Sequence, residues 1–112
     1  MSATFVAHVR ARPETVRLAP EGAPAIAVRV EMPEVWDVVR FAVSPVEPTI
    51  NVKLRALEEL APDMREHHED FVFKLRGWEV LDENAPLAEV GVVDGSILLL
   101  THRRKRPVRR GG

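Results

Sequence analysis

The chain has 112 residues, of which 46% are apolar and 29% charged, and this composition suits one globular domain. It contains no cysteine, which excludes disulfide bonds, thiolate nucleophiles and cysteine-based metal sites. The N-terminus lacks the pattern of a signal peptide, and no apolar run approaches the ~20 residues of a membrane span. We therefore expect a cytoplasmic protein with no membrane partner.

The net charge of −1 hides a strong asymmetry along the chain. Six of the 16 basic residues lie in RRKRPVRR at 103–110, which holds no acidic residue. Residues 1–102 therefore carry 10 basic against 17 acidic side chains, a net charge of −7. Repulsion among the arginines, together with Pro107, predicts a solvated tail that does not fold back on the domain.

Two strands and a helix are predicted in the first half of the chain. AIAVRVEM at 25–32 and DVVRFAVS at 37–44 alternate as half-buried strands do, and Pro33-Glu34 between them suits a turn. A helix is predicted over 49–61, with Thr49 as its N-cap and Pro62 ending it. Its apolar side chains recur at helical spacing and define the face expected to be buried: Ile50, Leu54, Leu57 and Ala61.

Two further strands are predicted at FVFKL, 71–75, and at GSILLLT, 95–101, the latter entered through a turn at Asp94-Gly95. Strand, strand, helix, strand and strand predict an α+β fold, with a mixed sheet and one helix packed across it. Residues 1–24 precede this unit as an N-terminal extension or an extra hairpin around Arg12-Pro13. The side chains expected in the core are Ile26, Val28, Val30, Val39, Phe41, Val43, Leu54, Leu57, Phe73, Leu98 and Leu100.

Four features resemble ubiquitin and its relatives, which have the β-grasp fold. They are the first hairpin leading into PTINVKLRAL at 48–57, FVFKLRG at 71–77, LAEVGVVDGSILLL at 87–100, and a basic tail ending in Gly111-Gly112. The resemblance covers residues 25–112. It implies a ubiquitin-like domain over 25–102 and a flexible tail over 103–112.

With its arginine-rich composition, the chain also resembles the ubiquitin-like modifiers of bacterial operons that encode an activating enzyme, a conjugating enzyme and an isopeptidase-like protease. Some of these operons are implicated in phage defence. The resemblance implies that the carboxylate of Gly112 is activated by a partner enzyme that uses ATP, and is then joined to amines of target proteins. Because glycine has no Cβ, Gly111 and Gly112 would fit a narrow catalytic channel. The chain itself would need no cofactor.

The tail arginines are expected to guide the chain to an acidic groove of the activating enzyme. A solvated spacer, a nucleic-acid contact and a localisation signal are the alternatives, and the acidic body and the lack of an aromatic residue in the tail argue against nucleic acid. The residues concerned are Arg103, Arg104, Arg106, Arg109 and Arg110.

A surface contact is expected on the outer face of the sheet, where ubiquitin-like proteins often present an apolar patch. Lys74 occupies the matching position on the third strand, Ile97 and Leu99 follow on the last strand, and Trp78 lies just past the glycine turn. An exposed tryptophan is favoured at interface hot spots, although such a residue more often packs half-buried against its sheet.

No catalytic site is visible in the sequence. The serines lack the flanks of a nucleophile elbow, and there is no glycine-rich phosphate loop, so we do not expect an enzyme. His67-His68-Glu69-Asp70 places potential metal ligands next to one another, but adjacent side chains diverge, so no metal site is predicted.

Two alternatives to the modifier stay open. The first is a sulfur carrier, which has the same fold and ends in a thiocarboxylate. The second is a non-covalent assembly module, in which the N-terminal arm pairs with the sheet edge of a neighbouring copy and gives a homo-oligomer.

Overall fold

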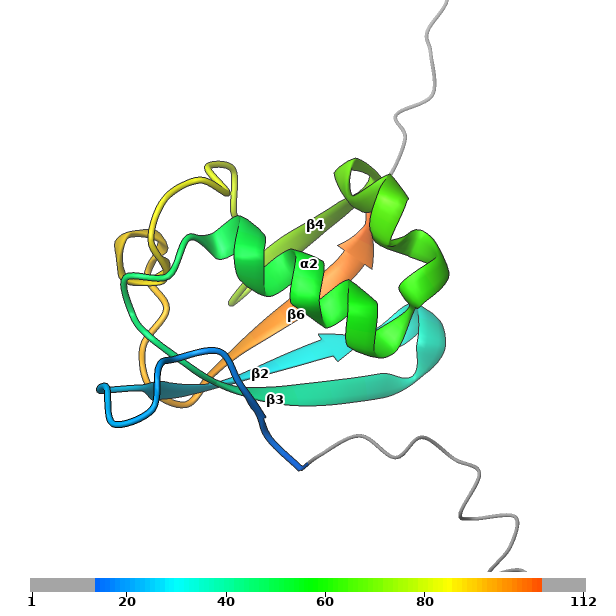
Figure 1. The fold of residues 1–112 in the computed structure, drawn as a ribbon. Coiled ribbons are helices and arrows are strands. Elements are labelled where there is room, and N and C mark those ends of the chain that lie inside the picture. The colour runs from blue at the N-terminus through cyan, green and yellow to red at the C-terminus, as the bar shows by residue number, and fades with distance from the viewer. Residues whose placement is uncertain (1–13, 104–112) are drawn as a thin grey trace, which may run out of the picture.

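The computed structural model describes residues 14–103 as a six-stranded mixed sheet with a helix packed across one face (Figure 1). The strands are β1 (Val16–Arg17), β2 (Ile26–Met32), β3 (Asp37–Val43), β4 (Phe71–Leu75), β5 (Trp78–Glu79) and β6 (Ser96–His102). The helical segments are η1 (Pro33–Val35), α2 (Thr49–Leu60), η2 (Pro62–Asp70) and η3 (Leu87–Val90). This confirms the α+β prediction.

The sheet has the strand order β1-β3-β2-β6-β4-β5. β2 pairs with β3 and β4 pairs with β6 in antiparallel fashion, while β2 and β6 run parallel in the middle of the sheet. The last strand is therefore inserted between the two hairpins. β6, the last strand of the described chain, is therefore a central strand rather than an edge strand.

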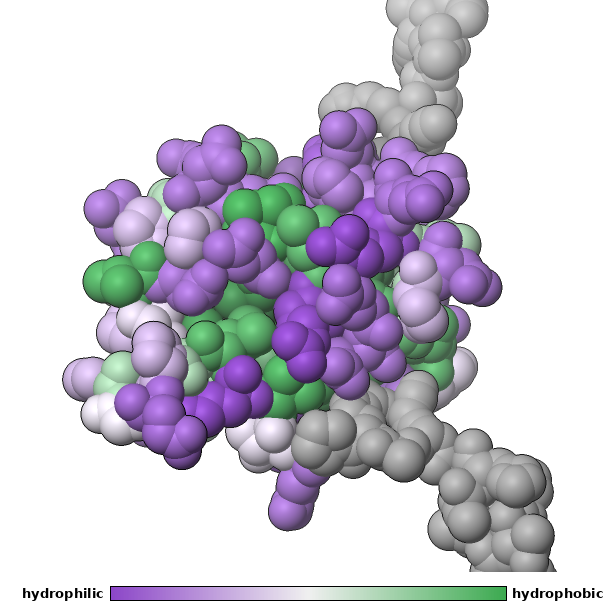
Figure 2. Space-filling model, in the orientation of Figure 1, coloured by the Kyte–Doolittle hydropathy of each residue, from purple (hydrophilic) through white to green (hydrophobic). Residues whose placement is uncertain are grey.

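The core lies between α2 and the facing side of the sheet. Nine of the eleven predicted core residues are buried, among them Phe41 and Leu57, each with none of its surface exposed. Ile26 is half-buried and packs against this core. Seen from the helix side, hydrophilic residues cover much of the surface, and hydrophobic residues show between them (Figure 2).

The helix has the predicted position but is rotated relative to the predicted buried face. Leu54, Ile50 and Ala61 are half-buried, while the buried positions are Thr49, Val52, Lys53, Ala56, Leu57 and Leu60. The N-cap prediction is also wrong, since Pro48 is the N-cap and the Thr49 hydroxyl donates to the carbonyl of Ala85 at 2.9 Å. A loop distant in sequence therefore accepts the hydrogen bond of the Thr49 hydroxyl.

Part of the predicted N-terminal extension belongs to the sheet. Val16 and Arg17 form β1, which pairs in parallel with Phe41 and Ala42 of β3. The Val16 side chain is buried in the core cluster, and the amide of Leu18 donates to the carbonyl of Ala42 at 2.8 Å. This segment supplies a strand in cis, whereas the predicted first half of the extra hairpin lies outside the described residues.

In the part of the chain that the structure describes, no helix is long and apolar enough to cross a membrane.

Candidate functional site

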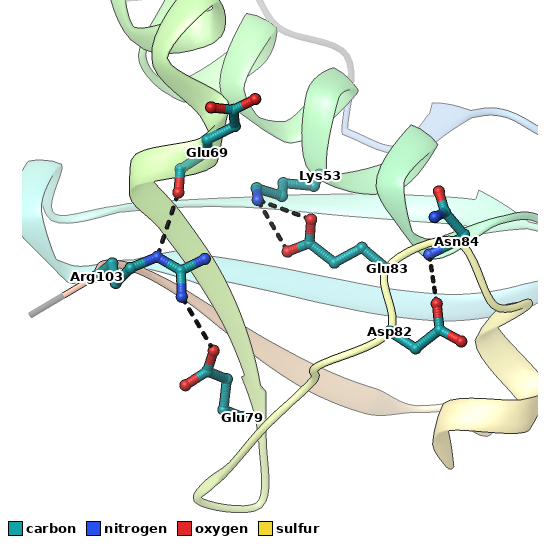
Figure 3. Close-up of polar contacts among 7 residues, drawn as sticks. All are labelled: Lys53, Glu69, Glu79, Asp82, Glu83, Asn84 and Arg103. Carbon is teal, nitrogen blue, oxygen red and sulfur yellow. Dashed lines mark hydrogen bonds and ion pairs between the residues drawn. The ribbon is translucent and has the colours of Figure 1, made fainter.

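Arg103 directly follows β6 and is the last residue that the structure describes. The Arg103 amide donates to the carbonyl of Asp70 at 2.6 Å, and its guanidinium Nε donates to the carbonyl of Glu69 at 3.3 Å. A second guanidinium nitrogen lies 3.4 Å from the carboxylate of Glu79 on β5 (Figure 3). Arg103 was predicted to belong to the solvated tail, but these contacts hold it against η2 and the β4–β5 hairpin.

A second anchor lies on the other side of β6. The carboxylate of Glu34, in η1, accepts hydrogen bonds from the amide of His102 at 2.8 Å and from the hydroxyl of Thr101 at 3.0 Å. Partial burial raises the pKa of this carboxyl, but the hydrogen bonds from His102 and Thr101 outweigh it and hold the pKa below its usual range. The ring of His102 also packs edge-on against Phe71 at 5.1 Å.

The two anchors fix the last residues that the structure describes. Since Arg103 and His102 are held on both sides, neither of them belongs to a solvated segment. The other predicted tail residues lie outside the described residues: Arg104, Arg106, Arg109, Arg110, Gly111 and Gly112.

Three of the four predicted surface residues come together on the outer face of the sheet. Lys74 on β4 pairs across to Leu99 on β6, and Ile97 lies two residues before Leu99 on the same face. They line a shallow hollow of about 500 Å³ that the turn residues 76–77 and 93–96 complete. Ile97 is 45% exposed, so this patch presents apolar surface beside cationic side chains.

Trp78 is exposed rather than half-buried against the sheet, and it does not join this patch. It lies on β5 with 79% of its surface exposed, and it lines a different hollow together with Val90 and Leu81, which is 83% exposed. The β4–β5 hairpin therefore carries a separate apolar surface.

Two further features were not found from the sequence. Trp36, at the turn after η1, has left-handed backbone with φ of 52° and 93% of its surface exposed. That conformation is rare for a bulky side chain, and the only signal for it in the sequence was the predicted turn at Pro33-Glu34, two positions earlier. Lys53 of α2 is buried and donates to both carboxylate oxygens of Glu83, at 2.8 and 3.0 Å (Figure 3).

The geometry described so far offers surfaces for contact and an anchored exit for a tail. Within residues 14–103, no group of three His, Asp or Glu side chains is placed to hold a metal ion.

No protein-family model matches the chain, and no curated protein matches its sequence. Solved structures do match. The ubiquitin-like domain of an Arabidopsis thaliana protein aligns with a TM-score of 0.59 and 17% identity, over 83% of this chain and 93% of that one. The ubiquitin of Caldiarchaeum subterraneum gives a TM-score of 0.57 and 16% identity, over 72% and 96%.

The C-terminal ubiquitin-like domain of mouse tubulin-specific chaperone e is also similar, with a TM-score of 0.59 and 12% identity over 80% of this chain and all of that one. At such identities the likeness concerns the fold alone. The chain has the ubiquitin-like β-grasp fold.

Proposed function

We propose that this chain is a ubiquitin-like modifier, activated at the carboxylate of Gly112 and joined to amines of target proteins by partner enzymes. The observation that carries the proposal is the ubiquitin-like fold whose central strand β6 leads through an anchored exit to Gly111-Gly112. Gly112 follows Arg103 by nine positions, so a fully extended tether reaches about 30 Å.

The chemistry of the proposal belongs to the partners. The activating enzyme joins the Gly112 carboxylate to the adenylyl group of ATP and releases pyrophosphate, and a thiolate then displaces AMP to give a thioester. A conjugating enzyme carries this thioester to a target amine, which displaces the thiol and forms an isopeptide bond. The chain contributes the acyl group and the surfaces that orient it. An isopeptidase-like protease hydrolyses the isopeptide bond and so releases the chain from its target.

The experiment is a charging assay with the cognate activating enzyme and ATP, read as a thioester by intact mass. Deletion of Gly112, or Gly111→Val with its branched Cβ, is expected to abolish charging while far-UV circular dichroism stays unchanged. Reversing the charge of Arg109 and Arg110 is expected to slow association in a salt-dependent way. Arg65→Glu in η2, compared with Arg109→Glu or Arg110→Glu alone, is the control with the same change of net charge away from the tail.

The same assay separates the alternatives. A sulfur carrier would be adenylated and would then gain a thiocarboxylate, seen as the exchange of one oxygen for sulfur without transfer to an amine. An assembly module would keep its self-association when Gly112 is deleted, because that contact does not use the Gly112 carboxylate. Charging that survives the deletion contradicts both the modifier and the sulfur carrier.

A further inference from the structure

A second hollow, of about 540 Å³, lies on the outer face of the sheet toward β1 and away from Lys74 and Leu99. Its floor is low because Ala27 of β2 and Ala42 of β3 lie directly opposite each other. Longer side chains of neighbouring positions surround these two alanines, and Ile97, which lies opposite Arg29 and diagonal to Ala27, forms an apolar wall on the β6 side. The hollow can therefore accept one aliphatic side chain.

Three arginines surround this floor. Arg29 and Arg40 lie directly opposite each other on β2 and β3, and Arg17 of β1 lies beside Ala42. Like charges opposite each other in a sheet are unfavourable, so the pair Arg29–Arg40 opposes stability where it stands. The carboxylate of Glu31, at 3.1 Å, pairs with Arg29 and reduces this repulsion, and the guanidinium of Arg17 donates to the carbonyl of Pro20 at 3.0 Å.

The ion pairs of the described residues set this face apart. In residues 14–103, five cations lie within 4 Å of a carboxylate: Arg29, Lys53, Arg55, Arg65 and Arg103. Arg17, Arg40, Lys74 and Arg76 form no such pair among the described residues, and all four line the two hollows of the outer face. Asp94 also lines both hollows, but its carboxylate accepts a hydrogen bond from the amide of Ala27 at 2.8 Å and pairs with none of these four cations, which remain available for an external anion.

We propose that the hollow around Ala27 and Ala42 binds an acidic peptide segment of a partner protein. One aliphatic side chain of the peptide sits on the alanine floor against Ile97, and flanking carboxylates pair with Arg17 and Arg40. This contact is non-covalent and uses neither the tail nor the Gly112 carboxylate. It therefore goes beyond the proposed conjugation chemistry and stands or fails independently of it.

The chemistry of the hollow favours a peptide over a nucleic acid. Bases need aromatic surfaces to stack on, and the one aromatic residue in the lining, Phe41, has its ring buried in the core. The net charge of −7 on residues 1–102 also opposes a long polyanion, whereas a short peptide responds mainly to charges within the Debye length of about 8 Å.

The test uses the full 112-residue chain and a fluorescein-labelled peptide with one leucine between two pairs of glutamates. Binding is followed by anisotropy, and amide shifts in NMR spectra locate the contact. The expected result is a shift of the amides around Ala27, Ala42 and Ile97, with binding weakened by about tenfold or more in Arg40→Glu. The peptide with glutamine in place of glutamate is expected to bind the unchanged chain at least as weakly as the glutamate peptide binds Arg40→Glu.

Matched variants separate this site from general attraction. Arg65→Glu makes the same change of net charge on η2, away from the sheet face, and should leave the affinity unchanged. Arg40→Glu removes the repulsion from Arg29 and should fold, as circular dichroism will show; Arg17→Glu tests the same site independently. Ala42→Leu fills the floor without changing charge and should also weaken binding.

Each contrary result overturns the proposal. Equal losses in Arg40→Glu and Arg65→Glu would mean that only net charge matters. Amide shifts confined to residues 104–112 would place the peptide on the basic tail. Tighter binding of a single-stranded oligonucleotide to the same amides would favour nucleic acid. If the mass measured by light scattering rises with protein concentration, and Arg40→Glu abolishes this rise, the occupant of the hollow would be a second copy of the chain.

Discussion

The buried pair between Lys53 and Glu83 gives the sharpest test of the packing. The lysine side chain is 1% exposed and the glutamate side chain 21%, and two hydrogen bonds join them. Glu83→Ala would leave the ammonium group buried without its carboxylate, which typically costs 3–5 kcal/mol. Since water can reach the partly exposed position of Glu83, we expect the lower end, about 3 kcal/mol.

The measurement is urea unfolding followed by far-UV circular dichroism. With an m-value of about 1–3 kcal/mol/M, the midpoint should fall by about 1–3 M. Adding Lys53→Met to Glu83→Ala removes the buried charge and should restore most of the stability. The control is Glu59→Ala, which breaks the pair with Arg55 at 3.1 Å and should cost less than about 1 kcal/mol, because that arginine is 40% exposed.

The reasoning would be refuted if Glu83→Ala cost no more than Glu59→Ala. It would also be refuted if Lys53→Met failed to rescue the Glu83→Ala variant, since the loss would then come from the loop rather than from the buried charge. The backbone of this loop contributes separately, because the amide of Ile50 donates to the carbonyl of Glu83 at 2.7 Å.

Three further predictions concern the fold and the exit of the tail. Leu57→Ala should cost about 2–5 kcal/mol in the same urea assay, because the side chain is fully buried, and an unchanged midpoint would remove α2 from its place. A chain shortened to begin at Pro24 should lose about 1.5–3 kcal/mol, because it loses the buried Val16 and the pairing of β1; undiminished stability would contradict the strand in cis. Because Glu34 has a lowered pKa, its contribution is present above the ordinary glutamate pKa and is lost as pH falls through the lower value in the fold; Glu34→Gln should flatten the decline of stability below about pH 5, and parallel pH curves would count against this anchor.

Local patterns predicted the strands well. FVFKL is β4 to the residue, and the other predicted strands agree with β2, β3 and β6 to within one residue at each end. These segments alternate strongly and end at turns, so neighbours in sequence contain the needed information. The fold class followed from the order of the elements.

The errors arose where distant contacts decide the outcome. Leu54 was expected in the core because the prediction counted only the spacing of apolar residues. The helix instead buries Lys53, whose ammonium group pairs with the carboxylate of Glu83, 30 positions further along the chain. β1 is two residues long, too short to show a period, and exists only because β3 lies beside it. Arg103 begins the basic run at 103–110 and was therefore assigned to the tail, but its contacts with η2 and β5 hold it on the domain.

The candidate site was predicted in part for the same reason. Lys74, Ile97 and Leu99 lie on strands whose register follows from alternation, so their common face could be foreseen. The ring of arginines around Ala27 and Ala42 depends on three strands at once, one of which was not predicted as part of the sheet.

The exposure of both indole rings has an optical consequence. The chain has two tryptophans and no tyrosine, and these tryptophans, Trp36 and Trp78, are 93% and 79% exposed in the folded domain. Their emission should already resemble that of indole in water, so unfolding should shift it little. Intrinsic fluorescence will consequently be a poor measure of folding for this protein. It will instead be sensitive to any partner that covers the turn after η1 or the β4–β5 hairpin, because each site carries its own ring.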